Sequence, residues 1–246
     1  MEVKPESRFG IHRIKEYPRL IEYISRFDTE ATRVNSIAIL IGLLTGLVIG
    51  VYDRALQYSN TLFGMQQGGF SLHEFPHYYV IFMPALGGLV VGGAISHFLI
   101  KKRYGVEGLI ETVTLRGARI KLTDVFLEVF TSIITISSGG ALGKEAPGGV
   151  LAGAGTGSFV GKILKSPERQ LQVLLGCGGA AGGIAAAFSA PLAGVVFVVE
   201  VIYGGELETK TFIPIVISSV FATLVSSTLF GIKPIEISSY QLVSPL

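Results

Sequence analysis

The sequence predicts an all-α polytopic membrane protein whose helices are interrupted rather than straight. Of its 246 residues, 49% are hydrophobic and only 15% are charged, whereas a soluble domain carries about 25% charged residues. The 32 glycines agree with this class, because small residues allow membrane helices to pack closely. A soluble protein with an unusually large core would need more polar surface than this composition supplies.

Six apolar tracts follow a polar, basic N-terminal segment. About 20 apolar residues are needed to span a bilayer, and the first, second and last tracts meet that length. The third and fourth are separated by the sequence GGALGKEAPGG. The fifth is too long for one span, so Pro191 is expected to end one helix and begin another within it. The tracts are residues 34–58, 78–100, 122–142, 146–164, 170–203 and 211–230.

The basic residues predict both the domain division and the membrane orientation. Residues 1–33 include the amphipathic stretch RLIEYISRF, which suits a helix at the membrane surface or a solvated helix. We therefore divide the chain into this cytoplasmic or interfacial segment and a membrane domain over 34–246. Segments 1–33 and 101–121 hold seven and six Lys or Arg, whereas the 53–77 loop has only Arg54. The positive-inside rule places the N-terminus in the cytoplasm and that loop outside.

Several classes of protein have no support in the composition. A net charge of +2 gives no basis for nucleic-acid binding. The single cysteine, Cys177, excludes an internal disulfide and a cysteine-based zinc site. No signal peptide is expected, because the N-terminus lacks an apolar core with a cleavage site. In the absence of Trp, anchoring at the membrane interface is expected from tyrosines: Tyr52, Tyr58, Tyr78 and Tyr79.

The stretch GGALGKEAPGGVLAGAG, residues 139–155, places Lys144 and Glu145 among glycines inside the apolar region. It is not a nucleotide-binding loop, because Ser138 stands where the first glycine belongs and Glu145 follows the lysine. Irregular backbone at membrane depth is tolerated only where it is buried in protein or lines an aqueous cavity. Pro147 suits the first turn of a new helix. The N-terminus of that helix would present unpaired N–H groups and a positive dipole to an anion.

Glu145 is a tethered carboxylate beside this predicted anion site. It could occupy the empty site and leave when a mobile anion arrives. Protonation would favour its departure, so one residue would act as gate and proton sensor. The spacing alone leaves an alternative open, in which Glu145 caps its helix or pairs with Lys144.

Three segments resemble the CLC family of chloride channels and transporters. GKEAP at 143–147 is similar to the family's G-[KR]-E-G-P motif, and AAGGIAAAFSAPLAGVVFVVE at 180–200 is similar to its AAG…AAAFNAPL-AG…E signature. PALGGLVVGGAISHFL at 84–99 resembles the family's third helix, and the whole resemblance covers roughly residues 34–230. It implies a broken-helix anion pathway with Glu145 as the gating glutamate and chloride as the default anion.

The resemblance also implies that backbone amides at this motif coordinate the anion. The anion-binding residues assigned in this way are Gly143, Lys144, Glu145, Ala146 and Gly148. Ala146 replaces the second glycine of the family motif. Because Ala adopts positive φ less readily, the local backbone geometry is expected to differ from that of the family.

The family's G-S-G-I-P loop, whose serine contacts the anion, has no clear counterpart. The stretch KRYGVEGLIETV, residues 102–113, lies at the corresponding place, so Tyr104 or Glu107 takes the serine's position. Tyr104 is preferred, since its hydroxyl can donate to an anion while an ionised Glu107 would repel one. Alternatively, neither residue touches the pathway and both belong to a cytoplasmic linker.

Proton-coupled members of the family carry a second acid directly after the glutamate that aligns with Glu200. This chain has Val201 at that position. The difference favours passive conduction or uncoupled transport over chloride–proton exchange. Glu200 could still lie on a proton path, although capping or pairing at a helix end is its more ordinary role.

The sequence matches only the first of two inverted-topology repeats that the family joins in one polypeptide. The expected partners are therefore chloride or another small anion, the lipid bilayer, and a second half-CLC chain or a second copy in a homodimer. The positive-inside bias argues against self-pairing in opposite orientations. Small-residue faces suit helix–helix contact, notably GLLTGLVIG at 42–50 and the serines of 218–227.

The function expected is that of an anion channel or transporter. It needs no covalent chemistry, and neither a metal nor an organic cofactor has a ligand set in the sequence. The alternative is a non-transporting membrane scaffold or binding protein, or a fragment that requires a second chain for transport. An enzyme with Glu145 as general base ranks third, because no nucleophile or second acid lies at a workable spacing.

Overall fold

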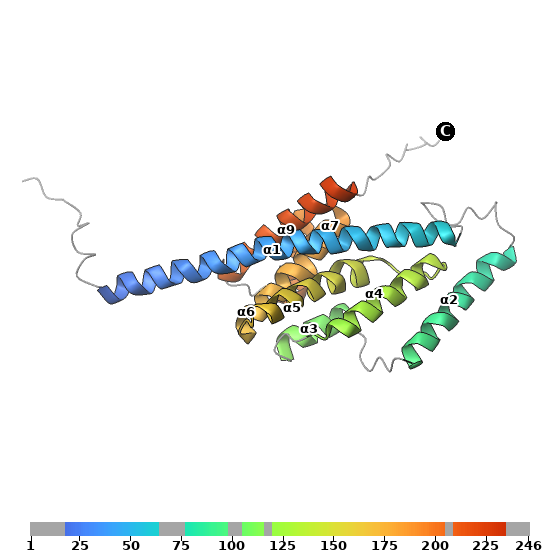
Figure 1. Cartoon of the computed structure of the whole chain (residues 1–246), viewed down its shortest axis with the longest axis horizontal. Coiled ribbons are helices and arrows are strands. Elements are labelled where there is room, and N and C mark those ends of the chain that lie inside the picture. Colours follow the sequence, from blue (N-terminus) through green and yellow to red (C-terminus); the bar gives the residue numbers. More distant parts are fainter. Residues whose placement is uncertain (1–17, 64–76, 98–104, 116–119, 205–208, 235–246) are drawn as a thin grey trace, which may run out of the picture.

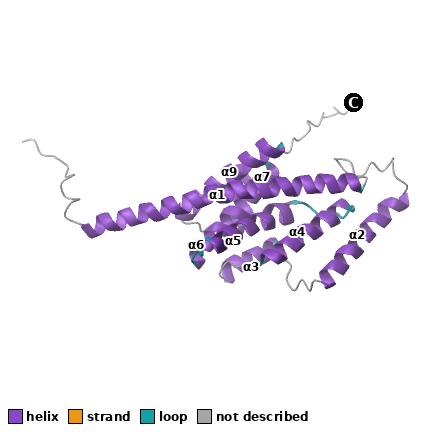
Figure 2. Cartoon of the chain, viewed as in Figure 1, coloured by secondary structure: helices purple, strands orange, loops and turns teal. Residues whose placement is uncertain are grey.

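The structure is a computed structural model that describes residues 18–63, 77–97, 105–115, 120–204 and 209–234. Within these ranges every regular element is a helix, as Figure 2 shows. The helices pack side by side into one bundle, along which the long first helix extends (Figure 1). They are α1 (Pro18–Leu62), α2 (His77–His97), α3 (Val106–Leu115), α4 (Leu122–Ser137), η2 (Glu145–Ala152), α5 (Gly153–Ile163), α6 (Glu168–Leu175), η3 (Gly176–Gly182), α7 (Gly183–Phe188), α8 (Pro191–Phe197), η4 (Val198–Ile202) and α9 (Thr209–Phe230).

Two of these helices are long and apolar enough to cross a bilayer by themselves. They are the Ala31–Leu62 part of α1, with 32 residues, and the Lys210–Phe230 part of α9, with 21 residues. Both therefore meet the length of about 20 apolar residues that a span requires. Helix α1 runs without a break across the expected domain boundary between residues 33 and 34, so that division remains a prediction.

The other apolar tracts form helices that change geometry or direction along their length. The π-helical segment η2 continues directly into α5, and the π-helical segment η3 joins α6 to α7. After α7 the chain turns at Ser189, which has a left-handed φ of 52°, and α8 begins at Pro191. The expected break at Pro191 is confirmed, because a proline fits the first turn of a helix but not its interior.

Helices α1 and α9 pack through small residues. Gly42 and Gly46 of α1 lie against the α9 backbone, so a Cβ at these glycines would lie 2.5 Å and 2.6 Å from the carbonyl oxygens of Ser218 and Ala222. Close approach of this kind needs small residues in both helices. Both small-residue faces, 42–50 and 218–227, therefore take part in helix–helix contact as expected, and the structure shows that they pack against each other.

Several hydroxyl groups inside the bundle are paired with partners on other helices. Thr45 of α1 and Thr156 of α5 form a buried hydrogen bond of 2.6 Å. On α9, Ser218 donates to the carbonyl of Cys177 at 2.8 Å, and Ser226 donates to the carbonyl of Ala186 at 3.1 Å. These bonds satisfy polar groups that no water could reach.

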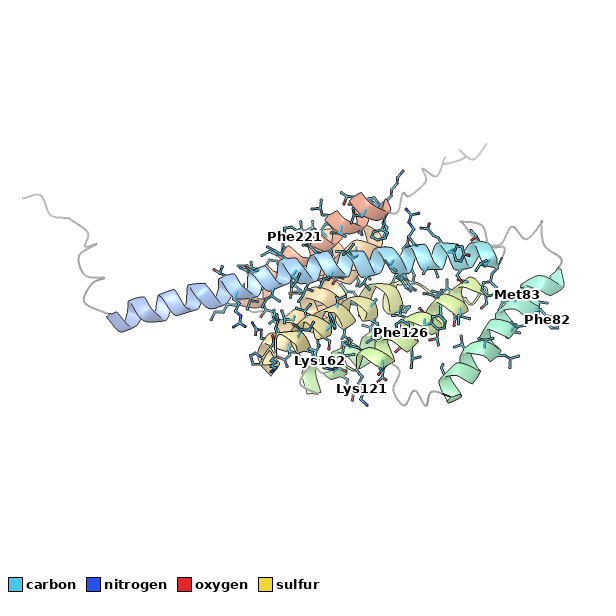
Figure 3. The ribbon with its side chains drawn as sticks, in the orientation of Figure 1. Phe82, Met83, Lys121, Phe126, Lys162 and Phe221 are labelled. Carbon is cyan, nitrogen blue, oxygen red and sulfur yellow. The ribbon has the colours of Figure 1, made fainter. Side chains whose placement is uncertain are left out.

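Large apolar side chains also cover the outside of the bundle. Phe82 of α2 and Phe126 of α4, both labelled in Figure 3, are exposed. Helix α2 lies at the edge of the bundle and packs against α4 (Figure 1). Outward apolar side chains of this kind suit contact with lipid rather than water.

Candidate anion site at the start of η2

The candidate site is built where α4 ends and η2 begins. Helix α4 ends at Ser137, and Gly139 then adopts a positive φ of 96°, a conformation that glycine reaches without strain. Residues 140–143 form no regular element. Helix η2 starts at Glu145, and its residues from Pro147 onward are buried. As expected from the sequence, Pro147 lies in the first turn of a new helix.

Backbone N–H groups at the start of η2 are available to an anion. The N–H of Gly148 already donates to the carbonyl of Lys144 at 2.9 Å, and Pro147 has no N–H. The N–H groups of Glu145 and Ala146 belong to the first helical turn, where no intrahelical acceptor exists. Two such donors at the positive end of a helix dipole are an arrangement that favours negative charge.

The Glu145 side chain lies back over Gly143 rather than reaching a partner. Its Oε2 atom occupies the space where a Cβ of residue 143 would stand, so glycine at this position leaves room for the carboxylate. No side-chain hydrogen bond caps η2. Among the residues that the structure describes, the Glu145 carboxylate forms neither a hydrogen bond nor an ion pair.

Lys144 pairs with an acid on α1 and not with its neighbour Glu145. Its ammonium Nζ lies 2.7 Å from Oδ1 of Asp53. Gln57, one turn later on α1, donates its amide to the other carboxylate oxygen of Asp53 at 2.7 Å. The side chain of Asp53 is only 13% exposed and that of Lys144 is 35% exposed. The ion pair therefore ties the Glu145 loop to α1.

Tyr52 of α1 completes the wall of the site, and the expectation that it anchors at the membrane interface is wrong. Tyr52 is only 5% exposed, and its ring packs against the Cα of Gly148. Its hydroxyl lies 3.4 Å from the hydroxyl oxygen of Ser132 on α4, within electrostatic range of Glu145 and Asp53. Because Gly148 has no side chain, the Tyr52 ring can pack directly on its Cα inside the bundle.

The other tyrosines predicted to anchor at the membrane interface are Tyr58, Tyr78 and Tyr79. Tyr58, on the last turns of α1, is 68% exposed and remains suitable for the interface. The side chains of Tyr78 and Tyr79 lie outside the described residues.

The remaining candidate residues lie on other elements. Tyr104 is outside the described residues. Glu107 is exposed in the first turn of α3, a helix whose Leu109 and Val113 belong to the apolar core. The 106–115 stretch is thus a packed helix and not an open linker. Glu200 is exposed within η4.

Sequence reasoning missed Asp53, Gln57 and Tyr52 as parts of the site. One signal for Asp53 was available, since it is an acid inside the first apolar tract, where charged residues are costly and usually paired. Its pairing with Lys144, 91 positions later, could be found only in three dimensions.

Broken helices, exposed apolar side chains and a glycine-rich loop before a helix N-terminus are typical of a membrane protein, and that helix N-terminus is a candidate anion site. A family model described as voltage gated chloride channel matches residues 87–245. A ClcB-like protein of Ralstonia nicotianae is 30% identical over 203 residues, which cover 80% of this chain. The ClcB voltage-gated ClC-type chloride channel of Yersinia pseudotuberculosis is 29% identical over 201 residues, or 79% of this chain. The chain belongs to the voltage-gated chloride channel family, CLC.

Solved structures share the fold. A CLC-type fluoride/proton antiporter matches with a TM-score of 0.71 at 21% identity, covering 89% of this chain and 52% of its own. A slow cyanobacterial Cl⁻/H⁺ antiporter matches with a TM-score of 0.66 at 22% identity, covering 87% of this chain and 51% of its own. The Ralstonia and Yersinia relatives are covered over 47% and 48% of their length. The chain thus spans about half the length of the relatives that it matches.

Proposed function

We propose that this chain forms half of an anion pathway, with chloride as the expected anion and Glu145 as its gate. The observation that carries the proposal is the free carboxylate of Glu145 beside two unpaired N–H donors, while the adjacent Lys144 is held by Asp53. A carboxylate without a partner can move, and a helix N-terminus without an acceptor can bind an anion in its place.

The mechanism follows from electrostatics. An ionised Glu145 competes with a mobile anion for the same positive helix end, and it repels an anion that approaches. Protonation removes that charge, so the side chain can leave and the anion can replace it. In the bound state, the N–H groups of Glu145 and Ala146 and the backbone near Gly143 would replace part of the ion's water shell. The ammonium of Lys144, expected from the sequence among these ligands, is instead held by Asp53.

The other assigned residues have weaker support. Gly148 serves the site through packing, since its missing Cβ admits the Tyr52 ring. Tyr104 remains the proposed hydroxyl donor, with Glu107 as the alternative. Glu200, followed by Val201, is a candidate for a proton path, and the missing second acid favours uncoupled conduction or transport. No metal or organic cofactor is part of the proposal.

The assembly proposed is a full pathway made with a second half-CLC chain. The curated relatives are about twice as long as the matched segment, so the other half of the pathway would come from another polypeptide or from further residues of the same one. A homodimer is a second possible assembly. We propose a cytoplasmic N-terminus, a proposal that the Lys and Arg of residues 1–33 and 101–121 support.

Chloride efflux from proteoliposomes tests the proposal. The parent chain is compared with Glu145→Gln between mildly acidic and neutral pH, with Asp124→Asn in the first turn of α4 as a matched control. We expect parent flux to rise as the pH falls, and we expect Glu145→Gln to lose that dependence. The free energy of unfolding of Glu145→Gln should lie within about 0.5 kcal/mol of the parent's, because the carboxylate has no partner to lose.

The alternative function makes a different prediction. A non-transporting scaffold gives no chloride flux in the parent or in either variant, at any pH. Flux that appears only after co-reconstitution with a second half-CLC chain identifies the chain as one part of a two-chain transporter.

A further inference from the structure

We propose that Asp53, on α1, is a positioning residue that sets the pH response of the Glu145 gate by neutralising Lys144. The inference rests on the gating role proposed for Glu145. The structural basis is the contact between one helix, α1, and both sides of the loop that carries the gate.

The ion pair is held in place from more than one direction. Asp53 accepts from Lys144 at 2.7 Å and from Gln57 at 2.7 Å, one bond to each carboxylate oxygen. One residue earlier on α1, the Tyr52 ring packs on Gly148 in the first turns of η2. Packing and the ion pair together fix Lys144 on α1, and its charge is compensated there.

Three side chains bring charge or a polar group to the neighbourhood of Glu145. Lys144 precedes it in the loop, Asp53 of α1 pairs with Lys144, and the Tyr52 hydroxyl interacts electrostatically with both Glu145 and Asp53. On α4, the residue that faces Tyr52 is the uncharged Ser132, and α7 carries no titratable group. On the elements other than α1 that pack against η2, the titratable groups are Asp124 and Glu128 on α4, Glu107 and Glu111 on α3, Lys162 on α5, and Cys177 on η3. Further along α1 toward its C-terminus stand Arg54 and Tyr58.

The sign of the effect follows from the net charge of the pair. With both partners present, the pair contributes no net charge beside Glu145. Without Asp53, Lys144 leaves a positive charge, which stabilises the ionised Glu145, so more acid is needed to open the gate. Without Lys144, Asp53 leaves a negative charge, which favours protonation, so the gate opens at higher pH.

The test measures the pH of half-maximal chloride flux in proteoliposomes, under the assembly conditions in which the parent conducts. We expect Asp53→Asn to lower that pH by about half a unit, and Lys144→Gln to raise it by a similar amount, since screening by water and salt limits the effect of a single charge. The double variant Asp53→Asn/Lys144→Gln should return the midpoint to the parent value. Opposite shifts that cancel in combination are not expected from a loop that is merely loosened.

The matched control is Arg54→Gln, the neighbouring charge on α1. Arg54 donates to the carbonyl of Phe230 at the end of α9, at 3.1 Å, so it serves the α1–α9 contact and not the loop. Its removal should leave the midpoint unchanged. Equal shifts in Arg54→Gln and Asp53→Asn, shifts of the same sign in Asp53→Asn and Lys144→Gln, or no shift in either, would overturn the proposal.

A second measurement separates this inference from the proposed function. Infrared pH titration of the purified full chain follows the carboxylic acid band that is present in the parent and missing in Glu145→Gln. The same opposite shifts are expected in this band for Asp53→Asn and Lys144→Gln, whether or not the chain conducts. Shifts without flux in the parent reject the gate but retain the electrostatic coupling, whereas flux with an unmoved band rejects the coupling alone.

Discussion

Helix α1 makes two contacts of opposite character within three turns. At Gly42 and Gly46 it meets α9 backbone to backbone, through small residues and without charge. At Tyr52 and Asp53 it meets the loop that carries Glu145 through an aromatic ring and an ion pair. The first contact cannot open without separating two helices, whereas the second holds a loop with a free carboxylate. Helix α1 is therefore fixed against α9 by the first contact, and it holds the Glu145 loop by the second.

The largest loss of stability is expected where the first contact is overfilled. In Gly46→Leu a side chain would enter a place where even a Cβ lies 2.6 Å from the Ala222 carbonyl and 2.7 Å from Val225 Cβ. We expect the free energy of unfolding in detergent to fall by about 3 kcal/mol. Gly92→Leu on α2 is the matched control, since nothing lies within 4 Å of a Cβ there. Equal losses in both variants would show that α1 and α9 are not closely packed.

A smaller loss is expected at the second contact. In Gly148→Ala the new methyl group meets the Tyr52 ring, and overpacking at one methyl should cost about 1–2 kcal/mol of unfolding free energy. Gly149→Ala is the control, because its nearest neighbour, Ile184 Cγ1, lies at 3.5 Å. Adding Tyr52→Ala should make the effect of Gly148→Ala much smaller, as a double-mutant cycle would reveal. If the free-energy losses of the two changes simply add, the Tyr52 ring does not contact Gly148.

The smallest effect is expected for the buried hydroxyl pair that joins α1 to α5. Thr45→Val keeps the shape of the side chain but removes its 2.6 Å hydrogen bond to Thr156. We expect a loss of about 0.6–1 kcal/mol in thermal or denaturant unfolding, as for other hydrogen bonds between membrane helices. Thr45→Val/Thr156→Val should cost less than the sum of the two single changes, because no unpaired hydroxyl remains. A single-variant loss above that of Gly148→Ala would reverse the order proposed here.

The helices and their breaks were predictable because they follow from local chemistry. Apolar runs marked the long helices, and Pro191 marked the turn between α7 and α8. Pro147, among glycines, marked the start of η2. Helix α3 was harder to predict, since the short stretch around Leu109 lies between basic segments, and only its burial shows that it belongs to the core.

The loop at Glu145 divides into what the sequence predicted and what it could not. The sequence singled out Glu145 and the helix N-terminus beside it, because an acid next to Pro147 and among glycines is costly inside an apolar region and is usually functional or paired. The sequence left open whether Lys144 would pair with that acid. Lys144 instead pairs with Asp53, a choice between two nearby carboxylates that depends on their positions in space.

The sequence by itself determined the membrane class, the succession of helices and the candidate gate, since hydrophobic runs, prolines and glycines act over a few residues. Only the tertiary structure decided which charges meet, that Tyr52 is buried on Gly148 rather than placed at an interface, and that the small faces of α1 and α9 face each other. These contacts join residues tens to more than a hundred positions apart. Which of these contacts form depends on the shape and charge of the surfaces that meet in three dimensions. A local sequence pattern contains no information about the surface on the other side of the contact.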